Sequence, residues 1–239
     1  MKPYYQDKWV TIYHGDCREI LPQLDVKVDL VLTDPPYIGL GSKTTIMPIG
    51  GVGKHYTRTE TVGDIWGANT DWIDLVLPKI KAGILVFCSY HSVDILPSLV
   101  GLKKIALIVW YKRNSPPAKQ NVPQFLTEYI WAFQANTGLN WHNLRTHYDI
   151  PKLATGCMAS SERFVDSNGI AIHPTQKPEA LISELLKVEP EIVLDPFLGS
   201  GTTCYCAKKL NRHSIGIEIE EKYCEIAAKR CCQEVMELA

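Results

Sequence analysis

A carboxylate, two prolines and an aromatic ring follow one another at Asp34-Pro35-Pro36-Tyr37. The residues before them are mostly apolar with β-branched members, which is typical of a buried strand. The prolines lack amide donors and fix φ, so the strand should end there in a stiff turn. The acid, the backbone carbonyls and the ring beyond it could bind a planar base, accepting its exocyclic amino protons while Tyr37 stacks on its face. The same residues could also simply end a strand.

A second apolar run, over 191–195, also ends in an acid, Asp195, and a glycine turn at Gly199-Ser200-Gly201 then opens a helical pattern. Glycines allow a ligand to approach the backbone, and the helix N-terminus offers free N–H groups. The spacing matches neither a dinucleotide fingerprint nor a phosphate loop. The next strand ends in Glu218, where an acid normally binds ribose hydroxyls. A nucleoside site without a phosphate-binding loop indicates S-adenosylmethionine as the cofactor.

In these two motifs, at 34–37 and 195–201, the chain resembles the amino-methylating DNA methyltransferases, which act on adenine N6 or cytosine N4. Residues 34–37 resemble their catalytic tetrapeptide, and residues 195–201 resemble their cofactor loop. The segment from Trp110 to Asn114 resembles another catalytic-side element. The likeness runs from about residue 9 to the C-terminal helix, and the order, catalytic motif first, is that of the beta class. The resemblance implies S-adenosylmethionine as methyl donor and DNA as partner.

The resemblance also implies roles for single residues around the cofactor. Glu218 would bind the ribose and Asp16, followed by Cys17, the adenine amino group, while Asp195 would orient either the glycine loop or the cofactor's ammonium. A segment at 173–178 matches a further cofactor-side element. The cofactor-binding residues implied in this way are Asp16, Cys17, His173, Thr175, Lys177, Asp195, Phe197, Gly199, Ser200, Gly201, Thr202 and Glu218.

These residues need a sheet that brings their strand ends together. Apolar, β-branched or aromatic runs predict strands at 9–14, 28–33, 82–90, 103–111, 127–134, 191–195 and 213–218. Helical patterns lie near 71–80, 91–100, 178–188, 201–211 and 220–238, with Pro178 as a first helical residue and Asn211 as a stop. The last helix should lead back to the strand at 9–14. We therefore expect one α/β domain over 1–239, with a doubly wound, mostly parallel Rossmann-like sheet that is circularly permuted.

Two long segments show neither the helical nor the strand periodicity of apolar residues, and such segments inside a compact domain are usually functional or disordered. We interpret 38–63 as a flap over the substrate and 137–172 as the target-recognition insertion, although both could be merely solvated. His142 and His147 could suggest a metal, but no cysteine or acid at ligand spacing supports one. The predicted DNA-binding residues are Lys43, Lys54, Arg58, Lys112, Arg113, Asn114 and Arg145.

Composition bears on the partners and the location of the protein. A net charge of −1 argues against a general basic coat, so DNA binding should depend on local patches. No long apolar run or signal peptide is evident, and the eight cysteines lack Cys-x-x-Cys spacing. These features favour a cytoplasmic protein with reduced thiols, no metal and no membrane partner. A homodimer is possible, since dimers occur among beta-class relatives.

The expected reaction is methylation of the N6 amino group of adenine in DNA, after the base is flipped out of the duplex. No covalent enzyme intermediate or metal is required, and no Pro-Cys dipeptide of the carbon-5 cytosine enzymes is present. Cytosine N4 is the alternative. The resemblance favours adenine, because the tetrapeptide with Asp first is commoner in the adenine enzymes, whereas the cytosine-N4 enzymes more often begin it with Ser. Less favoured are protein glutamine methylation, whose tetrapeptide begins with Asn, and a DNA-binding module that has lost catalysis.

Overall fold

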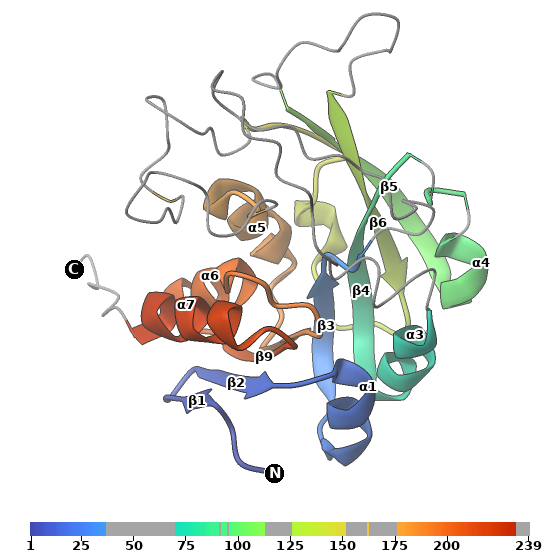
Figure 1. The fold of residues 1–239 in the computed structure, drawn as a ribbon. Helices are drawn as coiled ribbons and strands as arrows, with labels where there is room; N and C mark the ends of the chain where they lie inside the picture. Colours follow the sequence, from blue (N-terminus) through green and yellow to red (C-terminus); the bar gives the residue numbers. More distant parts are fainter. Residues whose placement is uncertain are drawn as a thin grey trace, which may run out of the picture.

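The chain folds around a single large sheet. The computed structural model describes residues 1–36, 70–90, 92–94, 96–112, 126–151, 162 and 176–232. In this part of the chain nine strands form one sheet in the order β1-β2-β9-β8-β3-β4-β6-β5-β7 (Figure 1). The strands are β1 Tyr5–Gln6, β2 Val10–His14, β3 Val28–Thr33, β4 Ile80–Cys88, β5 Lys103–Tyr111, β6 Thr127–Gln134, β7 His147–Asp149, β8 Ile192–Asp195 and β9 His213–Glu218. The five neighbours from β2 to β4 all run parallel, so the predicted mostly parallel sheet is confirmed.

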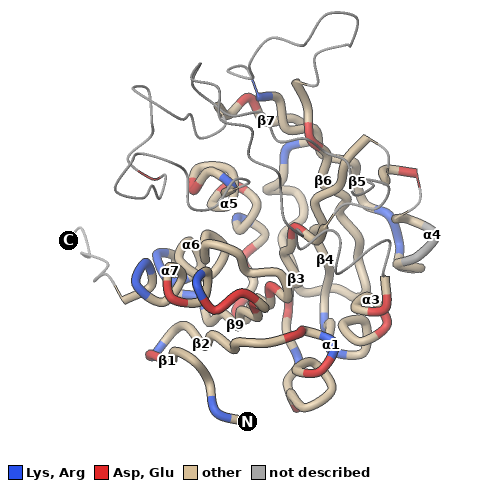
Figure 2. Tube along the Cα trace, viewed as in Figure 1, with Lys and Arg blue, Asp and Glu red and all other residues tan. Residues whose placement is uncertain are grey.

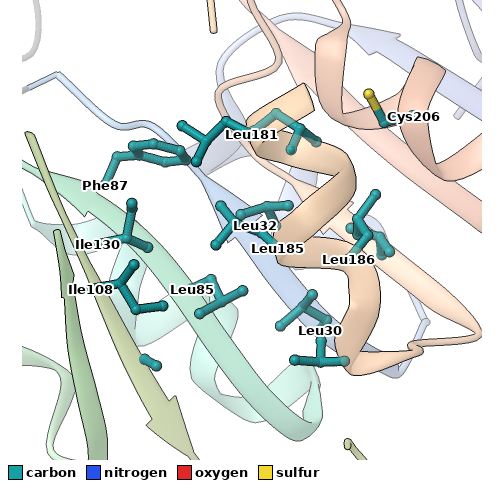
Figure 3. Packing of buried hydrophobic residues seen from close by; sticks show 14 of the residues in the cluster. Leu30, Leu32, Leu85, Phe87, Ile108, Ile130, Leu181, Leu185, Leu186 and Cys206 are labelled. Carbon is teal, nitrogen blue, oxygen red and sulfur yellow. The ribbon is translucent and has the colours of Figure 1, made fainter. Parts of the chain in front are cut away.

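Helices cover both faces of this sheet (Figure 1). One layer holds α1 Cys17–Ile20, α3 Asp71–Val76 and α4 Leu96–Val100; the other holds α5 Glu179–Leu185, α6 Thr202–Lys209 and α7 Glu221–Cys232. Strand side chains alternate between the layers, as the period of two requires. Leu30 and Leu32 of β3 pack in a cluster with Leu181 and Leu185 of α5 (Figure 3). Val31, between them, belongs to the cluster that includes α3. The doubly wound arrangement is therefore confirmed.

The N-terminal strand completes a sheet begun by the C-terminal half of the chain. β2 pairs in parallel with β9, with His14 opposite Glu218. The amide of Gly15 then donates to the carbonyl of Glu218 at 2.9 Å, which joins the two strand ends. α7, which follows β9, packs on β2 through the cluster that contains Val10 and Ala227. This is the circular permutation predicted from the order of the motifs.

The edge of the sheet beyond β4 is antiparallel. β6 lies between β4 and β5 and runs against both. β7 adds a short parallel strand to β5, so part of the predicted insertion over 137–172 extends the sheet. Trp141 packs over the backbone of β4, where a Cβ at Gly83 would lie only 2.4 Å from its ring.

Several predicted boundaries differ from the observed ones. The helix expected over 71–80 ends at Val76 and gives way to the 3-10 turn Leu77–Lys79, which contains Pro78, and β4 then begins at Ile80 rather than at residue 82. Pro178 is not the first helical residue of α5, because its ψ of 138° is extended and it caps the helix. Asn211 does follow α6 as predicted, with a left-handed φ of 54°.

No helix among the described residues has both the length and the apolar character needed to cross a bilayer.

Candidate active site

The two predicted functional corners lie at the same edge of the sheet. β3 and β8 are parallel neighbours, with Val31 opposite Leu194. Their carboxyl ends are joined directly, because the Thr33 hydroxyl donates to Asp195 Oδ1 at 2.8 Å. Asp34 follows Thr33 in the chain, so the predicted catalytic residue comes directly after the residue whose hydroxyl is hydrogen-bonded to Asp195. The shared edge on which the sequence interpretation depends is therefore present.

Asp195 is buried and ties the glycine loop to β3. Its Oδ1 also accepts the amide of Phe197 at 3.1 Å, and Thr203 donates a further side-chain hydrogen bond. Burial raises the pKa of this carboxyl to about 6, with a smaller contribution from the charge of Asp34, against hydrogen bonds that lower it. The sequence left two roles open for Asp195, orienting the glycine loop or binding the cofactor's ammonium. These contacts favour the first, because they hold the start of the loop.

The glycine loop follows as a left-handed turn. Gly199 and Gly201 have φ values of 55° and 81°, which favour glycine, and Gly201 is the N-cap of α6. Ser200 and Thr202 are buried beside them. Phe197 is half-buried and meets the ring of Trp72 edge-on at 5.4 Å. The loop and the N-terminus of α6 are the elements that we expect to contact a small ligand.

Glu218 ends the neighbouring strand and supports this loop. It is 8% exposed, and its two oxygens accept the amides of Gly199 and Glu220, each at 2.8 Å. Burial raises its pKa, against these hydrogen bonds. Acidic residues gather here, where β9 ends and α7 begins (Figure 2). Each carboxylate oxygen has a second lone pair, so Glu218 can still accept a ribose hydroxyl. The residues present therefore fit the nucleoside of S-adenosylmethionine.

Asp16 and Cys17 lie at the next strand end. Asp16 caps α1, accepting the amide of Arg18 at 2.8 Å, and pairs with the guanidinium of the same residue. Burial raises the pKa of Asp16, but the hydrogen bonds from Arg18 outweigh it and hold the pKa below its usual value. Cys17 is 2% exposed and packs in the core cluster with Ile20. The predicted contact of Asp16 with the cofactor's adenine stays a prediction.

Lys177 bridges the two corners. Its carbonyl accepts a hydrogen bond from the Thr202 hydroxyl at 3.4 Å, beside the glycine loop. Its ammonium, however, donates to Asp34 Oδ2 and lies 3.5 Å from Glu128 Oε2. The side chain predicted to line the cofactor pocket thus reaches the predicted catalytic carboxylate.

Arg230, which the sequence did not single out, reinforces the loop from α7. It is 2% exposed, and its guanidinium donates to Thr202 Oγ1 at 2.8 Å and to Glu179 Oε1 at 2.9 Å. Glu128 and Thr33 were missed as well. An acid in the apolar run 127–134 was the only available signal for Glu128.

The predicted DNA-binding residues are only partly described. Lys112 is 13% exposed and binds Glu128 Oε1 at 2.8 Å, whereas Arg145 is exposed. Pro35 is buried and Pro36 half-buried in the turn after Asp34. The flap 38–63 and the following predicted site residues lie outside the described residues: Tyr37, Lys43, Lys54, Arg58, Arg113, Asn114, His173 and Thr175. Within the described ranges, no group of three or more His, Cys, Asp or Glu side chains is placed to hold a metal.

Fold and site together define a class: a Rossmann-like methyltransferase domain with a glycine loop and an acidic corner on one sheet edge. The sequence pattern of the DNA methylase family N6_N4_Mtase matches residues 28–229. The chain belongs to this family of DNA methylases. It is an S-adenosylmethionine-dependent DNA methyltransferase, as the sequence predicted.

Individual relatives are similar over nearly their whole length. The chain is 28% identical to the type II methyltransferases M2.MboI of Moraxella bovis and M2.DpnII of Streptococcus pneumoniae, over 96% of this chain and 91% and 92% of theirs. The crystal structure of the M1.HpyAVI–SAM complex is 27% identical with a TM-score of 0.66, over 94% of this chain and 100% of that chain. The cytosine-N4-specific PvuII DNA methyltransferase is 18% identical, covers 99% of this chain and 91% of its own, and with a TM-score of 0.68 shows the shared fold.

Proposed function

We propose that this enzyme methylates the N6 amino group of adenine in DNA, after flipping the base out of the duplex. The observation that carries the proposal is the join between Thr33 and Asp195, which sets the Asp34 corner beside the glycine loop. An aspartate at the first position of the tetrapeptide favours adenine over cytosine N4, given the family pattern. Bound S-adenosylmethionine would supply the methyl group, held by Glu218 and the loop 197–201.

The chain's own groups would prepare the amino nitrogen. Its lone pair is delocalised into the base, so hydrogen bonds from its two protons to Asp34 and to the Pro35 carbonyl would favour a tetrahedral nitrogen with a localised lone pair. Asp34 need not be a strong base, because the proton becomes acidic only when the nitrogen has gained its fourth substituent. Tyr37 would stack on the extruded base and offset part of the unstacking cost of a few kcal/mol. Positioning then supplies most of the acceleration.

A thiol nucleophile, as carbon-5 cytosine methylation uses, is not supported at this edge. Cys88 is the last residue of β4, which runs parallel to β3, so it lies at the same edge of the sheet as Asp34; it is buried. Burial, followed by the charges of Asp34 and Glu128, raises the pKa of this thiol to about 12. Cys88 therefore stays protonated near neutral pH and supplies no thiolate. The seven described cysteines are free thiols, and all but Cys232 are buried, which supports a reducing, cytoplasmic location. A homodimer stays a prediction.

The direct test transfers a labelled methyl group to unmethylated DNA and identifies the modified nucleoside by mass spectrometry. We expect N6-methyladenine; N4-methylcytosine would establish the alternative, and no labelled nucleoside would refute both. Asp34→Ala should abolish transfer while calorimetry still detects cofactor binding. If Asp34→Ala keeps near-normal turnover, the catalytic assignment is wrong. Glu218→Ala provides the reciprocal control, because it should weaken cofactor affinity.

A further inference from the structure

Four side chains of alternating charge extend from the catalytic corner to β5. The ammonium of Lys177 donates to Asp34 Oδ2 and lies 3.5 Å from Glu128 Oε2. The other oxygen of Glu128 binds the ammonium of Lys112 at 2.8 Å. We propose that Lys177 and Glu128 are positioning residues for methyl transfer: Lys177 fixes the Asp34 carboxylate as an acceptor for the substrate's amino group, and Glu128 holds Lys177 in place.

Lys177 is constrained in a way that surface lysines are not. Its side chain is 10% exposed, and its ammonium lies 4.9 Å from the centre of the Phe87 ring. Its backbone is tied to the Thr202 hydroxyl, and α5 begins two residues later. A lysine held at both its backbone and its ammonium has lost most of its rotamer freedom, so its contact with Asp34 is a fixed feature of the site.

Lys177 acts as a cation rather than as a base. Burial by itself lowers its pKa, but the charges of Asp34 and Glu128 and their hydrogen bonds outweigh this and raise the pKa above its usual value. The ammonium therefore keeps its protons at neutral pH and can only donate. This excludes Lys177 as acceptor of the substrate's proton and leaves Asp34 as the acceptor next to it.

The site needs such a cation because carboxyl groups crowd this edge. Asp34, Glu128 and Asp195 come from the ends of three strands, and the charge of Asp34 already raises the pKa of Asp195. Like charges at short range favour protonation of one member, and a protonated Asp34 would be a weaker acceptor, because one of its oxygens would carry a proton. Lys177 lies between two of these carboxylates and offsets their repulsion.

Glu128 explains how Lys177 can stay in place when substrate arrives. It stands on β6, opposite Trp110 of β5, and uses one oxygen for each lysine. When the substrate's amino group takes up part of the acceptor capacity of Asp34, the Lys177 ammonium retains a second carboxylate partner. A buried ammonium without that partner would be costly to keep charged. Glu128 therefore acts on the reaction only through Lys177.

The inference rests on the proposed methyl transfer to DNA, and it competes with the role predicted for Lys177 as a cofactor ligand. The variants that separate them are Lys177→Met, Lys177→Arg and Glu128→Gln, with Lys209→Met as matched control. Lys209 likewise pairs with a glutamate, Glu179, but lies on α6 outside the site. Each variant is assayed with labelled cofactor and bulk unmethylated DNA, and its cofactor Kd is measured by calorimetry.

For Lys177→Met we expect kcat to fall by about 100-fold, as a misplaced reacting group typically costs, with the cofactor Kd within about twofold of wild type. Lys177→Arg, which keeps the cation, should restore part of kcat. Glu128→Gln should lower kcat less, and Lys209→Met should leave it unchanged.

The pH profile distinguishes positioning from mere structural support. The acidic limb of kcat/KM should move upward by about one pH unit or more in Lys177→Met, because an opposite charge favours the ionised form of a carboxylate. The charged groups that face this cation are Asp34 and Glu128. Lys112, Asp195 and Cys88 interact in turn with these two carboxylates. An unmoved limb with normal kcat would overturn the inference.

Other outcomes are equally decisive. A raised cofactor Kd with normal kcat at saturation would make Lys177 a cofactor ligand and overturn the inference. If Lys177→Met does not fold, as judged by thermal unfolding, Glu128→Gln decides, since a wild-type kcat and pH profile in that variant would overturn it. Failure of the wild-type enzyme to methylate any DNA would instead refute the proposed function itself.

Discussion

Asp195 is held as a buried carboxyl at the centre of the site, and this should be measurable as a pH-dependent loss of stability. Its pKa rises from 3.8 to about 6 on folding, because burial disfavours the charged form more than the hydrogen bonds from Thr33, Thr203 and Phe197 favour it. Below pH 3.8 the group is protonated in both states. As the pH rises toward 6 the unfolded chain ionises first, so stability contributed by this group is lost as the pH passes through about 6.

The magnitude follows from the two pKa values. Each pKa unit corresponds to about 1.4 kcal/mol, so ionised Asp195 costs about 3 kcal/mol at neutral pH. Asp195→Asn keeps the shape of the side chain and cannot ionise. Relative to wild type, the variant should therefore gain about 3 kcal/mol in free energy of unfolding between about pH 4 and about pH 7.

The assay is urea unfolding of both proteins without cofactor, at several pH values in this window. Other shifted carboxyls, such as Glu218, contribute to both proteins, so the difference between the curves isolates Asp195. Asp29→Asn is the matched control: Asp29 bridges the same two strands at their other ends, accepting the amide of Ile192 at 2.8 Å, and pairs with Lys81. If the difference in free energy of unfolding between Asp195→Asn and wild type does not change with pH, the reasoning is refuted, whether the variant is more or less stable.

Two further predictions concern the support of the glycine loop. Gly201→Ala should lower the free energy of unfolding by about 2–3 kcal/mol, because its Cβ would lie 2.7 Å from the Cβ of Ala227. Gly101→Ala is the control, because Gly101 also has a left-handed φ but its Cβ would meet nothing within 4 Å; an equal loss of stability in both variants by urea unfolding would show that the clash is not the cause. Arg230→Met should cost about 3 kcal/mol and weaken cofactor affinity in calorimetry, because it removes the buried donor to Thr202; unchanged unfolding and Kd would contradict this.

Local sequence was enough to locate the two corners of the site. Strand-ending acids, prolines and glycines have their effect within a few residues, so Asp34, Asp195 and the left-handed Gly201 could be found without knowing the fold. The order of these motifs also predicted that β2 would join β9, because a parallel strand must be reached through a crossover helix. Two of the helix boundaries that were wrong lie next to Pro78 and Pro178, and the helix predicted near 91–100 begins only at Leu96.

The contacts of the lysines could not be predicted in the same way. Lys112 was predicted to contact DNA and Lys177 to bind the cofactor, yet the structure brings both to Glu128. Their meeting depends on β6 lying antiparallel between β4 and β5. A strand pattern shows which side chains share a face, but not which strands become neighbours.

The sequence by itself therefore located the groups at each strand end: an acidic corner suited to an amino group and a glycine loop suited to a nucleoside. The tertiary structure alone decided which charges surround Asp34, because Lys177 and Glu128 come from segments distant in the chain. Short-range preferences fix turns and strand ends, whereas the pairing of buried charges follows from the order of strands in the sheet.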